Sequence, residues 1–178
     1  MITNLKLFIG TIIFCLLFTG CTGSKKHAIK SGSETAENRI NPYFSRTDTQ
    51  QINVSNAQWK KILNPELYKV ARLGDTEVPF TGKYNDFKGL GIYYCAVCGN
   101  QLFRSDSKFS STCGWPSFFE PSRKNSVVYK QDTSYGMVRE EVLCGRCKSH
   151  LGHVFDDGPE PTGKRYCMNS ICLDFVPD

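Results

Sequence analysis

Two cysteine pairs restrict the folds open to this chain more than any other feature of its sequence. The segments CAVC at 95–98 and CGRC at 144–147 share the CxxC spacing, and Gly99 and Gly145 permit the tight turn that each pair needs. Four thiolates in two such turns form the tetrahedral site of a structural zinc ion. Because 45 residues separate the pairs, the turns can meet only through the tertiary fold. The predicted ligands of one zinc ion per chain are Cys95, Cys98, Cys144 and Cys147.

Other uses of these residues stay open at the level of sequence. In an oxidising compartment the four thiols can form disulfides instead, although a CxxC disulfide closes a very small loop and is typical of redox catalysts. His150 and His153 continue the spacing by threes after Cys147, so two cysteines and two histidines also make a plausible metal site. We favour the four-cysteine set, because it leaves neither CxxC pair without a metal.

The first 20 residues have the pattern of a secretion signal. Lys6 precedes an apolar run from Leu7 to Phe18 that is too short to span a bilayer as a helix. The run ends at FTGC, which resembles the lipobox of bacterial lipoproteins and implies cleavage before Cys21 and lipidation of that cysteine. Ordinary cleavage and an uncleaved anchor are the alternatives. All three place the rest of the chain outside the cytoplasm, and lipidation predicts a membrane-anchored lipoprotein on the periplasmic or cell-surface side.

The middle of the chain separates this leader from a folded part. Residues 21–54 are polar and predict a flexible tether, which leaves 55–178 as one domain large enough to bury a core. The formal net charge of +5 is too small to favour a nucleic-acid partner. We expect a monomer.

Local patterns in the domain predict helices first and strands afterwards. SNAQ fits a capping box with Ser55 as N-cap, and Asn64-Pro65 ends one helix and begins another, so a short helical hairpin is expected. Strand-like runs between turns follow it: GIYYC, QLFRS, SVVYK, GMVREEVLC, HVFDD and KRYCMNSICLDFVP. The expected fold is mainly β and antiparallel, with helices at its N-terminus.

Three cysteines of the domain lie outside the CxxC pairs, namely Cys113, Cys167 and Cys172. In a strand, Arg165, Cys167 and Asn169 lie on the same face. A nearby cation lowers the pKa of a thiol and thereby favours the nucleophilic thiolate. Cys172 lies on the opposite face of a regular strand and is expected to pack in the core. The pattern indicates a reactive Cys167, with a packing role as the alternative.

Several separated motifs resemble those of the peptide-methionine (R)-S-oxide reductases, the MsrB family. They are GDTEVPFTGKY at 74–84, CAVCGNQLFRSDSKFSSTCGWPSF at 95–118 and REEVLCGRCKSHLGHVFDDGPEPTGKRYCMNS at 139–170. The resemblance covers about residues 56–176 and is specific, because the motifs occur in the family's order. It implies an antiparallel, tent-like β fold of the zinc-containing type, in which zinc is structural.

The resemblance also implies an activity, the thiol-dependent reduction of methionine (R)-sulfoxide in proteins. Cys167 matches the catalytic cysteine, whose thiolate attacks the sulfoxide sulfur and becomes a sulfenic acid, and Arg165 matches a residue that stabilises the thiolate. Cys113 matches the resolving cysteine, which forms a disulfide with Cys167 that a thioredoxin-like dithiol reduces. The expected substrates are oxidised methionines in envelope proteins.

Five further residues are assigned to the site by the same resemblance. His150, His153 and Asn169 match residues that organise the site by hydrogen bonds to water and to the sulfoxide oxygen. Trp115 matches the aromatic wall that receives the substrate's methyl group, and Phe155 is expected to close the same pocket. The alternative for Trp115 is ordinary core packing. The alternative for His150 or His153 is a hydrogen-bonded position in the core.

Two other functions explain part of the sequence. A membrane-tethered, non-catalytic zinc-ribbon module that binds another protein accounts for the CxxC pairs and the tether, but not for Cys113 and Cys167 in their motifs. A general thiol-disulfide oxidoreductase would use one CxxC pair as its active dithiol, and bound zinc would exclude it because the metal occupies those thiols.

Overall fold

The structure of the protein is a computed structural model that describes residues 41–178. The predicted signal sequence, the lipidation site Cys21 and residues 21–40 of the predicted tether lie outside the described residues. Within the described part of the chain, no helix is long and apolar enough to cross a membrane. The signal, the anchor and the location of the protein therefore stay predictions.

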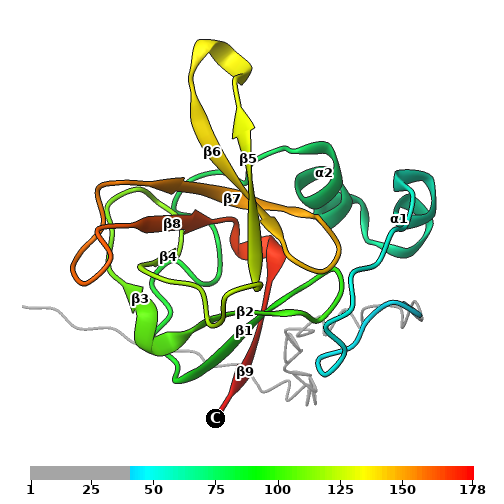
Figure 1. Ribbon diagram of the computed structural model, residues 1–178, viewed down its shortest axis with the longest axis horizontal. Coiled ribbons are helices and arrows are strands. Elements are labelled where there is room, and N and C mark those ends of the chain that lie inside the picture. Colours follow the sequence, from blue (N-terminus) through cyan, green and yellow to red (C-terminus); the bar gives the residue numbers. More distant parts are fainter. Residues whose placement is uncertain (1–40) are drawn as a thin grey trace, which may run out of the picture. The chain divides into compact units, whose positions relative to one another are not determined.

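The N-terminal helical hairpin forms where the capping residues predict it. Helix α1 (Asn56–Ile62) begins with a complete capping box, in which Ser55 accepts from the backbone of Gln58 and the Gln58 side chain accepts from the backbone of Ser55. Asn64 caps α2 (Pro65–Leu73), which has proline at its first position. Its buried stripe packs α2 against the large β-sheet and against the turn before the last strand (Figure 1). The predicted hairpin is confirmed.

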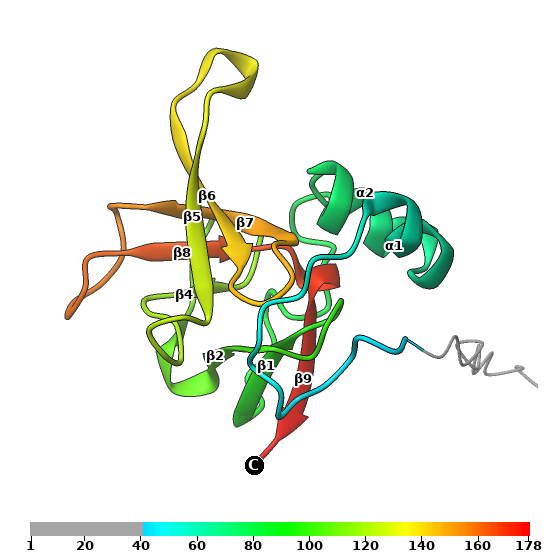
Figure 2. The ribbon, with the colours of Figure 1, turned by 45° about the vertical axis from the view of Figure 1, so that its right-hand side comes forward.

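The rest of the described chain forms two antiparallel sheets (Figures 1 and 2). The smaller has the strand order β2-β1-β9, and the larger has the order β3-β4-β8-β7-β6-β5. The strands are β1 (Gly91–Cys95), β2 (Gln101–Arg104), β3 (Lys108–Phe109), β4 (Ser117–Phe118), β5 (Val127–Asp132), β6 (Arg139–Cys144), β7 (His150–Phe155), β8 (Arg165–Met168) and β9 (Leu173–Pro177). Short 3-10 turns occupy Ser105–Ser107, Ser134–Gly136 and Ser170–Cys172. The predicted mainly β, antiparallel fold is confirmed.

A cluster of aromatic rings joins the two sheets. Tyr93 of β1, Phe103 of β2 and Phe118 of β4 are fully buried. The Phe118 ring stacks on Phe103 with a centroid separation of 4.4 Å and meets Tyr93 edge-on at 5.0 Å. Full burial of each such side chain contributes about 1.5–3 kcal/mol. The core therefore lies between the sheets, beneath the strands that carry the site residues.

Residues 41–54, which the sequence placed in a flexible tether, instead run along the domain (Figure 2). The amide of Ser45 donates to the carbonyl of Cys98 at 2.9 Å, and the amide of Ile52 donates to that of Arg146 at 3.0 Å. The polar composition of this segment was misleading, because its polar groups bind the domain's backbone and not only water. The ordered part of the chain thus includes residues before the predicted start at 55.

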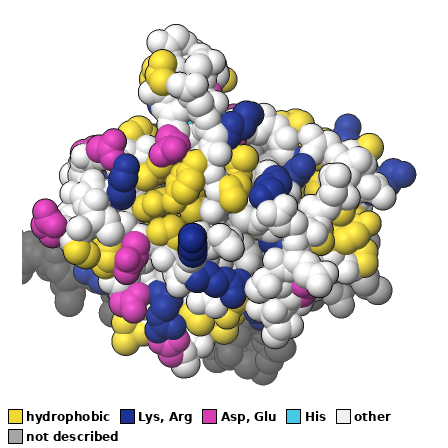
Figure 3. Space-filling view, in the orientation of Figure 1, with side chains coloured by type: hydrophobic (Ala, Val, Ile, Leu, Met, Phe, Trp, Pro, Cys, Tyr) yellow, Lys and Arg dark blue, Asp and Glu magenta, His cyan; other side chains and the backbone are white. Residues whose placement is uncertain are grey.

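The hairpin of β5 and β6 projects from the body of the molecule (Figures 1 and 2). Three side chains at its tip are exposed, Tyr135, Met137 and Val138, and hydrophobic atoms are visible there in Figure 3. Asp132 and Arg139 are the last strand pair before the turn of the hairpin, and they form an ion pair at 2.6 Å. This end of the two strands contributes to the site.

Candidate active site and metal site

The four CxxC sulfurs converge at one point. All four Sγ atoms lie within 4.8 Å of one another, and all four residues are buried. Cys95 and Cys147 are 3.8 Å apart and Cys98 and Cys144 are 3.6 Å apart, sulfur to sulfur. A tetrahedral zinc ion with bonds of about 2.3 Å requires sulfurs about 3.8 Å apart, whereas a disulfide requires about 2.05 Å. The four-cysteine geometry therefore fits a metal ion and not disulfides.

Local backbone geometry explains why each sulfur pair forms. Strand β1 ends at Cys95 and a turn follows, closed by a hydrogen bond from the amide of Gly99 to the Cys95 carbonyl. Gly99 has a φ of 78°, in the left-handed region that favours glycine. At Gly145, a Cβ would lie 2.0 Å from the carbonyl oxygen of Asn125, so a side chain does not fit. Gly99 therefore has the role in a tight turn that the sequence suggested, whereas Gly145 is required by the close approach of the Asn125 carbonyl.

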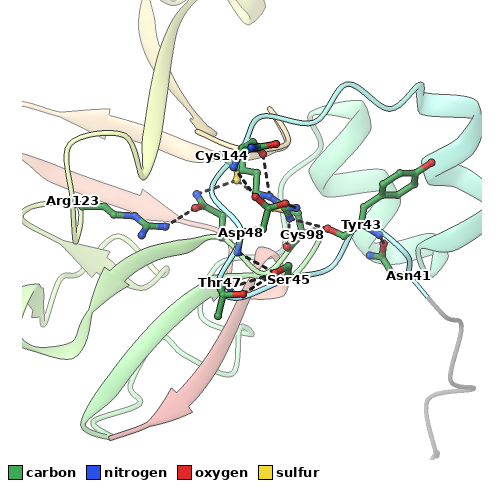
Figure 4. A network of polar contacts seen from close by, with 11 residues as sticks. Asn41, Tyr43, Ser45, Thr47, Asp48, Cys98, Arg123 and Cys144 are labelled. Atoms are coloured by element: carbon green, nitrogen blue, oxygen red, sulfur yellow. Dashed lines mark hydrogen bonds and ion pairs between the residues drawn. The ribbon is translucent and has the colours of Figure 1, made fainter.

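Residues of the N-terminal segment lie beside Cys98 and Cys144 of this cluster (Figure 4). The guanidinium of Arg146, whose side chain is 4% exposed, donates to the carbonyls of Tyr43 and Cys98 at 2.7 Å each and pairs with Asp48. The side-chain amide of Asn100 donates to Sγ of Cys144 at 3.6 Å. None of these supports was expected from the sequence: the contacts with Tyr43 and Asp48 depend on the path of residues 41–54, and those of Arg146 with Cys98 and of Asn100 with Cys144 depend on how the two CxxC turns meet.

Neither histidine belongs to the metal-ligating group. Nδ1 of His150 lies 2.7 Å from Glu141, and Nε2 of His153 lies 2.8 Å from Asp132. The two imidazole rings lie edge to face with their centroids 5.5 Å apart. The alternative site of two cysteines and two histidines is therefore not formed in the described structure.

The predicted nucleophile and the predicted resolving cysteine are neighbours. Cys167 lies in β8, where its register partners are Ser117 of β4 and His153 of β7. Cys113 lies in the loop before β4, and its Sγ is 3.1 Å from that of Cys167. Sγ of Cys113 also contacts the Ser117 hydroxyl at 3.3 Å. Both thiols are half-buried and close enough to form a disulfide with a small shift.

The two thiols compete for one proton. Contact with Cys167 lowers the pKa of Cys113 to about 4. Contact with Cys113 and burial raise the pKa of Cys167, while Arg165 acts in the opposite direction. The pair therefore carries one negative charge at neutral pH, shared across the contact. Arg165 lowers the pKa of Cys167, as its position in the strand predicted, but the contact with Cys113 raises that pKa by more.

Arg165 is held in place from two sides. Its guanidinium makes two hydrogen bonds to the carboxylate of Asp157, each 2.8 Å long. Its Cζ lies 4.4 Å from the ring centroid of Phe155, its register partner in β7. A cation over an aromatic face is stabilised by the electron density of the ring. Phe155 thus lies at the site both as a wall and as a support for the arginine.

A small pocket opens over Cys167. It has a volume of about 110 Å³ and is lined by Thr76, Trp115, Arg139, Gly152, His153, Phe155, Cys167 and Asn169. The structure thus brings together five of the residues assigned to the site by resemblance. His150 does not line the pocket; it is buried behind His153. The pocket has room for the end of one side chain, with an indole on one wall and polar groups beside the sulfur.

Two carboxylates of the β5–β6 hairpin orient the histidines, and sequence reasoning missed both. Asp132 binds His153 and Glu141 binds His150. Burial lowers the pKa of His153, and the contact with Asp132 opposes this shift. The hydroxyl of Ser134 donates to Asp132 and lowers the pKa of that carboxyl. The roles of Asp132 and Glu141 follow only from the pairing register of β5, β6 and β7, which the sequence alone does not reveal.

Glu77 is a second support that the sequence did not reveal. Its backbone amide donates to Oδ1 of Asn169 at 3.0 Å, and its carbonyl accepts from Nε1 of Trp115 at 3.2 Å. Its carboxylate accepts from the amides of Ser170 and Ile171 at 2.5 and 3.1 Å. One residue of the lead-in segment GDTEVPFTGKY therefore fixes the indole wall and the end of β8 relative to each other.

Comparisons with known proteins agree with this geometry. A family model described as "SelR domain" matches residues 63–177. A protein named peptide methionine sulfoxide reductase MsrB from Pseudomonas putida (strain W619) is 54% identical over 128 residues, which are 72% of this chain and 96% of that protein. The protein of the same name from Pseudomonas savastanoi pv. phaseolicola is 56% identical over 120 residues, 67% of this chain and 92% of that protein. With this identity and coverage, the chain belongs to the peptide methionine sulfoxide reductase MsrB family.

Proposed function

We propose that this protein reduces methionine (R)-sulfoxide in proteins to methionine, with Cys167 as nucleophile and Cys113 as resolving thiol. The observation that carries the proposal is the 3.1 Å contact of Sγ of Cys113 with Sγ of Cys167, which lines a pocket walled by Trp115. A non-catalytic zinc module needs neither the thiol pair nor the pocket. Membership of the MsrB family supports the same reaction.

The pocket explains how the substrate is oriented. The sulfoxide side chain enters with its methyl group against the indole of Trp115 and its oxygen toward His153 and Asn169. This arrangement distinguishes the two epimers, because exchanging methyl and oxygen would place a polar atom on the indole and an apolar group among hydrogen-bonding groups. The amide of Asn169 is available to this site because Glu77 and the Leu151 carbonyl hold it in place.

The reaction consumes two thiols and releases water. The Cys167 thiolate attacks the sulfoxide sulfur, protons reach the oxygen, and methionine leaves as Cys167 becomes a sulfenic acid. Asp132 holds Nε2 of His153, so Nδ1 is the nitrogen that exchanges a proton with the pocket. Cys113 then attacks the sulfenic sulfur, which releases water and forms the Cys113–Cys167 disulfide. A thioredoxin-like dithiol restores the two thiols.

The four-cysteine cluster is assigned to one structural zinc ion. Cys95, Cys98, Cys144 and Cys147 occupy all four positions of a tetrahedral site, so no position is open to substrate. When bound, zinc supplies a cross-link between the ends of β1 and β6 and takes no part in the reaction. With all four thiols occupied, neither CxxC pair can serve as the active dithiol of a general oxidoreductase.

The test is turnover of the two separated methionine sulfoxide epimers by the zinc-loaded protein with dithiothreitol. Reduction of the R epimer alone is expected, and Cys167→Ser should abolish it. Folded, zinc-bearing protein that reduces neither epimer would contradict the proposal and would leave the tethered zinc module as the explanation.

The location of the reaction is a separate part of the proposal. Lipidation of Cys21 would anchor the enzyme outside the cytoplasm, where oxidised envelope proteins are its substrates and an extracytoplasmic dithiol is its reductant. Labelled palmitate should be incorporated into the wild-type chain and not into Cys21→Ser. Equal labelling of both would contradict the anchor. A single monomer mass in detergent is the expected oligomeric state.

A further inference from the structure

A short loop with exposed apolar side chains lies directly beside the thiol pair. The backbone amide of Phe80 donates to the carbonyl of Gly114 at 2.7 Å, and Gly114 directly follows Cys113 in the chain. A Cβ at Gly114 would lie 2.7 Å from the Cβ of Pro79 and 3.1 Å from the Phe80 ring. The loop of residues 78–81, here named the 78–81 loop, therefore packs closely against the backbone that carries Cys113.

The loop presents its apolar side chains to solvent and holds one of them at a conformational cost. Val78 and Phe80 are each 66% exposed. Phe80 has a φ of 65°, in the left-handed region that a bulky residue rarely adopts. The hydroxyl of Thr81 closes the turn by donating to the Val78 carbonyl at 2.7 Å. Neither the strain nor the exposure stabilises the fold, and such features concentrate at functional surfaces.

We propose that the 78–81 loop is the docking surface for the protein dithiol that reduces the Cys113–Cys167 disulfide. This inference rests on the proposed function and names the contact surface of its recycling partner. Any reductant must bring a sulfur into bonding distance of the bridge, so its surface must cover the exposed surroundings of Cys113. Val78 and Phe80 are exposed apolar side chains there, and they suit the apolar, water-excluded centre of an interface with a protein partner.

The substrate does not explain the same surface. Trp115, Phe155 and the polar groups around them line the pocket over Cys167, whereas neither Val78 nor Phe80 lines it. The loop thus packs beside Gly114, between Cys113 and Trp115, while its exposed side chains lie outside the substrate pocket. A partner docked there approaches the bridge without entering the pocket.

The partner supplies both thiols and both electrons that reduction of the Cys113–Cys167 disulfide requires. A thiolate of the partner attacks one sulfur of the bridge, so an intermolecular S–S bond forms as the Cys113–Cys167 bond breaks and the released sulfur takes up a proton. The partner's second thiol then attacks the intermolecular bond and releases the reduced enzyme. Two electrons pass to the enzyme, and the partner leaves as a disulfide.

The experiment compares a protein reductant with a small one. Turnover of a sulfoxide peptide by the zinc-loaded full chain in detergent is measured with thioredoxin, regenerated by its reductase and NADPH, and separately with dithiothreitol. For Phe80→Ser and Val78→Ser, KM for thioredoxin should rise roughly tenfold, as for a central contact of an interface, while dithiothreitol turnover stays within about twofold. Leu90→Ser is the control, because Leu90 is 74% exposed, binds the C-terminal residue Asp178 through its carbonyl and does not line the pocket over Cys167; it should change neither value.

A second variant separates docking from folding. Phe80→Gly relieves the left-handed strain and should not lower the Tm, yet it removes the same ring and should raise KM for thioredoxin as Phe80→Ser does. An unchanged KM for thioredoxin in these variants would overturn the proposal. A rise in KM for the sulfoxide peptide with both reductants would also overturn it, because the loop would then bind substrate. Failure of the wild-type protein with dithiothreitol would instead refute the reductase function itself.

Discussion

At the scale of single residues, the site depends on which of two adjacent thiols carries the shared proton. Contact across 3.1 Å gives Cys113 the lower pKa and Cys167 the higher one, although Cys167 is the proposed nucleophile. Attack by Cys167 therefore requires its proton to pass to Cys113 or to the pocket as the substrate binds. Arg165 favours that transfer because it lowers the pKa of Cys167.

The proton sharing predicts two different alkylation profiles. A thiol with a lowered pKa stays ionised as the pH falls, so Cys113 in the wild-type protein should react with iodoacetamide down to a pH near 4, while Cys167 reacts only at high pH. Cys113→Ala removes the largest cause of the raised pKa and should move the Cys167 profile to lower pH. Peptide mass mapping after timed alkylation measures both. A Cys167 profile that stays in place or moves upward in Cys113→Ala would show that the thiols do not share a proton.

At the scale of elements, the β5–β6 hairpin and the lead-in segment at Glu77 orient groups that belong to other strands. Asp132 stands at the end of β5 and binds His153 of β7, although β6 lies between these strands in the sheet. The position of the imidazole is thereby linked to the last strand pair of a projecting hairpin, next to its turn. Substitutions at that pair should affect the pH dependence of the reaction more than the stability of the fold.

We expect Asp132→Asn to lower kcat roughly tenfold at neutral pH, because an amide does not orient and stabilise the His153 imidazole as a carboxylate does. Asp132 raises the pKa of His153, so its removal lets that pKa fall further and leaves less of the imidazole protonated at a given pH. The alkaline limb of the kcat profile should therefore move to lower pH. Glu141→Gln is the matched control, since it affects His150, which does not line the pocket. Equal effects of the two variants would contradict a specific role of Asp132.

Sequence patterns predicted the elements and residues whose signals are local. The capping box at Ser55, the CxxC turns and most of the strand-like runs depend on neighbours within a few positions, and the structure has them. The run KRYCMNSICLDFVP is the exception: the strand ends at Met168, and a 3-10 turn at Ser170–Cys172 divides the run into β8 and β9 of different sheets, so Cys172 is buried in a turn and not on the far face of one strand. The family resemblance supplied five of the eight residues that line the pocket, and it missed Thr76, Arg139 and Gly152. The supports around them, Glu77, Asp132 and Glu141, depend on which strands pair and in what register, so no local pattern reveals them. The contacts of residues 41–54 with the domain also depend on the tertiary fold, so the sequence did not predict them.

At the scale of the whole molecule, two clusters of buried side chains connect the two sheets in the part of the chain that the structure describes. One is the aromatic cluster of Tyr93, Phe103 and Phe118, and the other is the cysteine cluster, in which Cys95 ends β1 of the small sheet and Cys144 ends β6 of the large one. The active-site strands β7 and β8 lie in the large sheet, and the last strand β9 returns to the small one. Loss of the metal should therefore loosen one sheet from the other.

Removal of the metal should destabilise the whole domain. Structural zinc contributes on the order of 10 kcal/mol to small domains, so Cys95→Ser should lose zinc and unfold at a much lower temperature. Cys172→Ala is the matched control: Cys172 is equally buried but lies outside the cluster, and the change should cost about 1 kcal/mol with zinc retained. Metal content and thermal unfolding by circular dichroism test both. A zinc-free Cys95→Ser protein with the wild-type Tm would show that the aromatic cluster alone keeps the two sheets together.

The path of the N-terminal segment has a mechanical consequence. Asn41 binds the Val97 carbonyl, and Ser45 and Asp48 bind Cys98 and Arg146, so the chain enters the domain at the cysteine cluster. Under the proposed lipid anchor, tension on the chain before Asn41 would load these hydrogen bonds first. Force would thus reach the four-cysteine cluster before it reached β8, which carries Cys167.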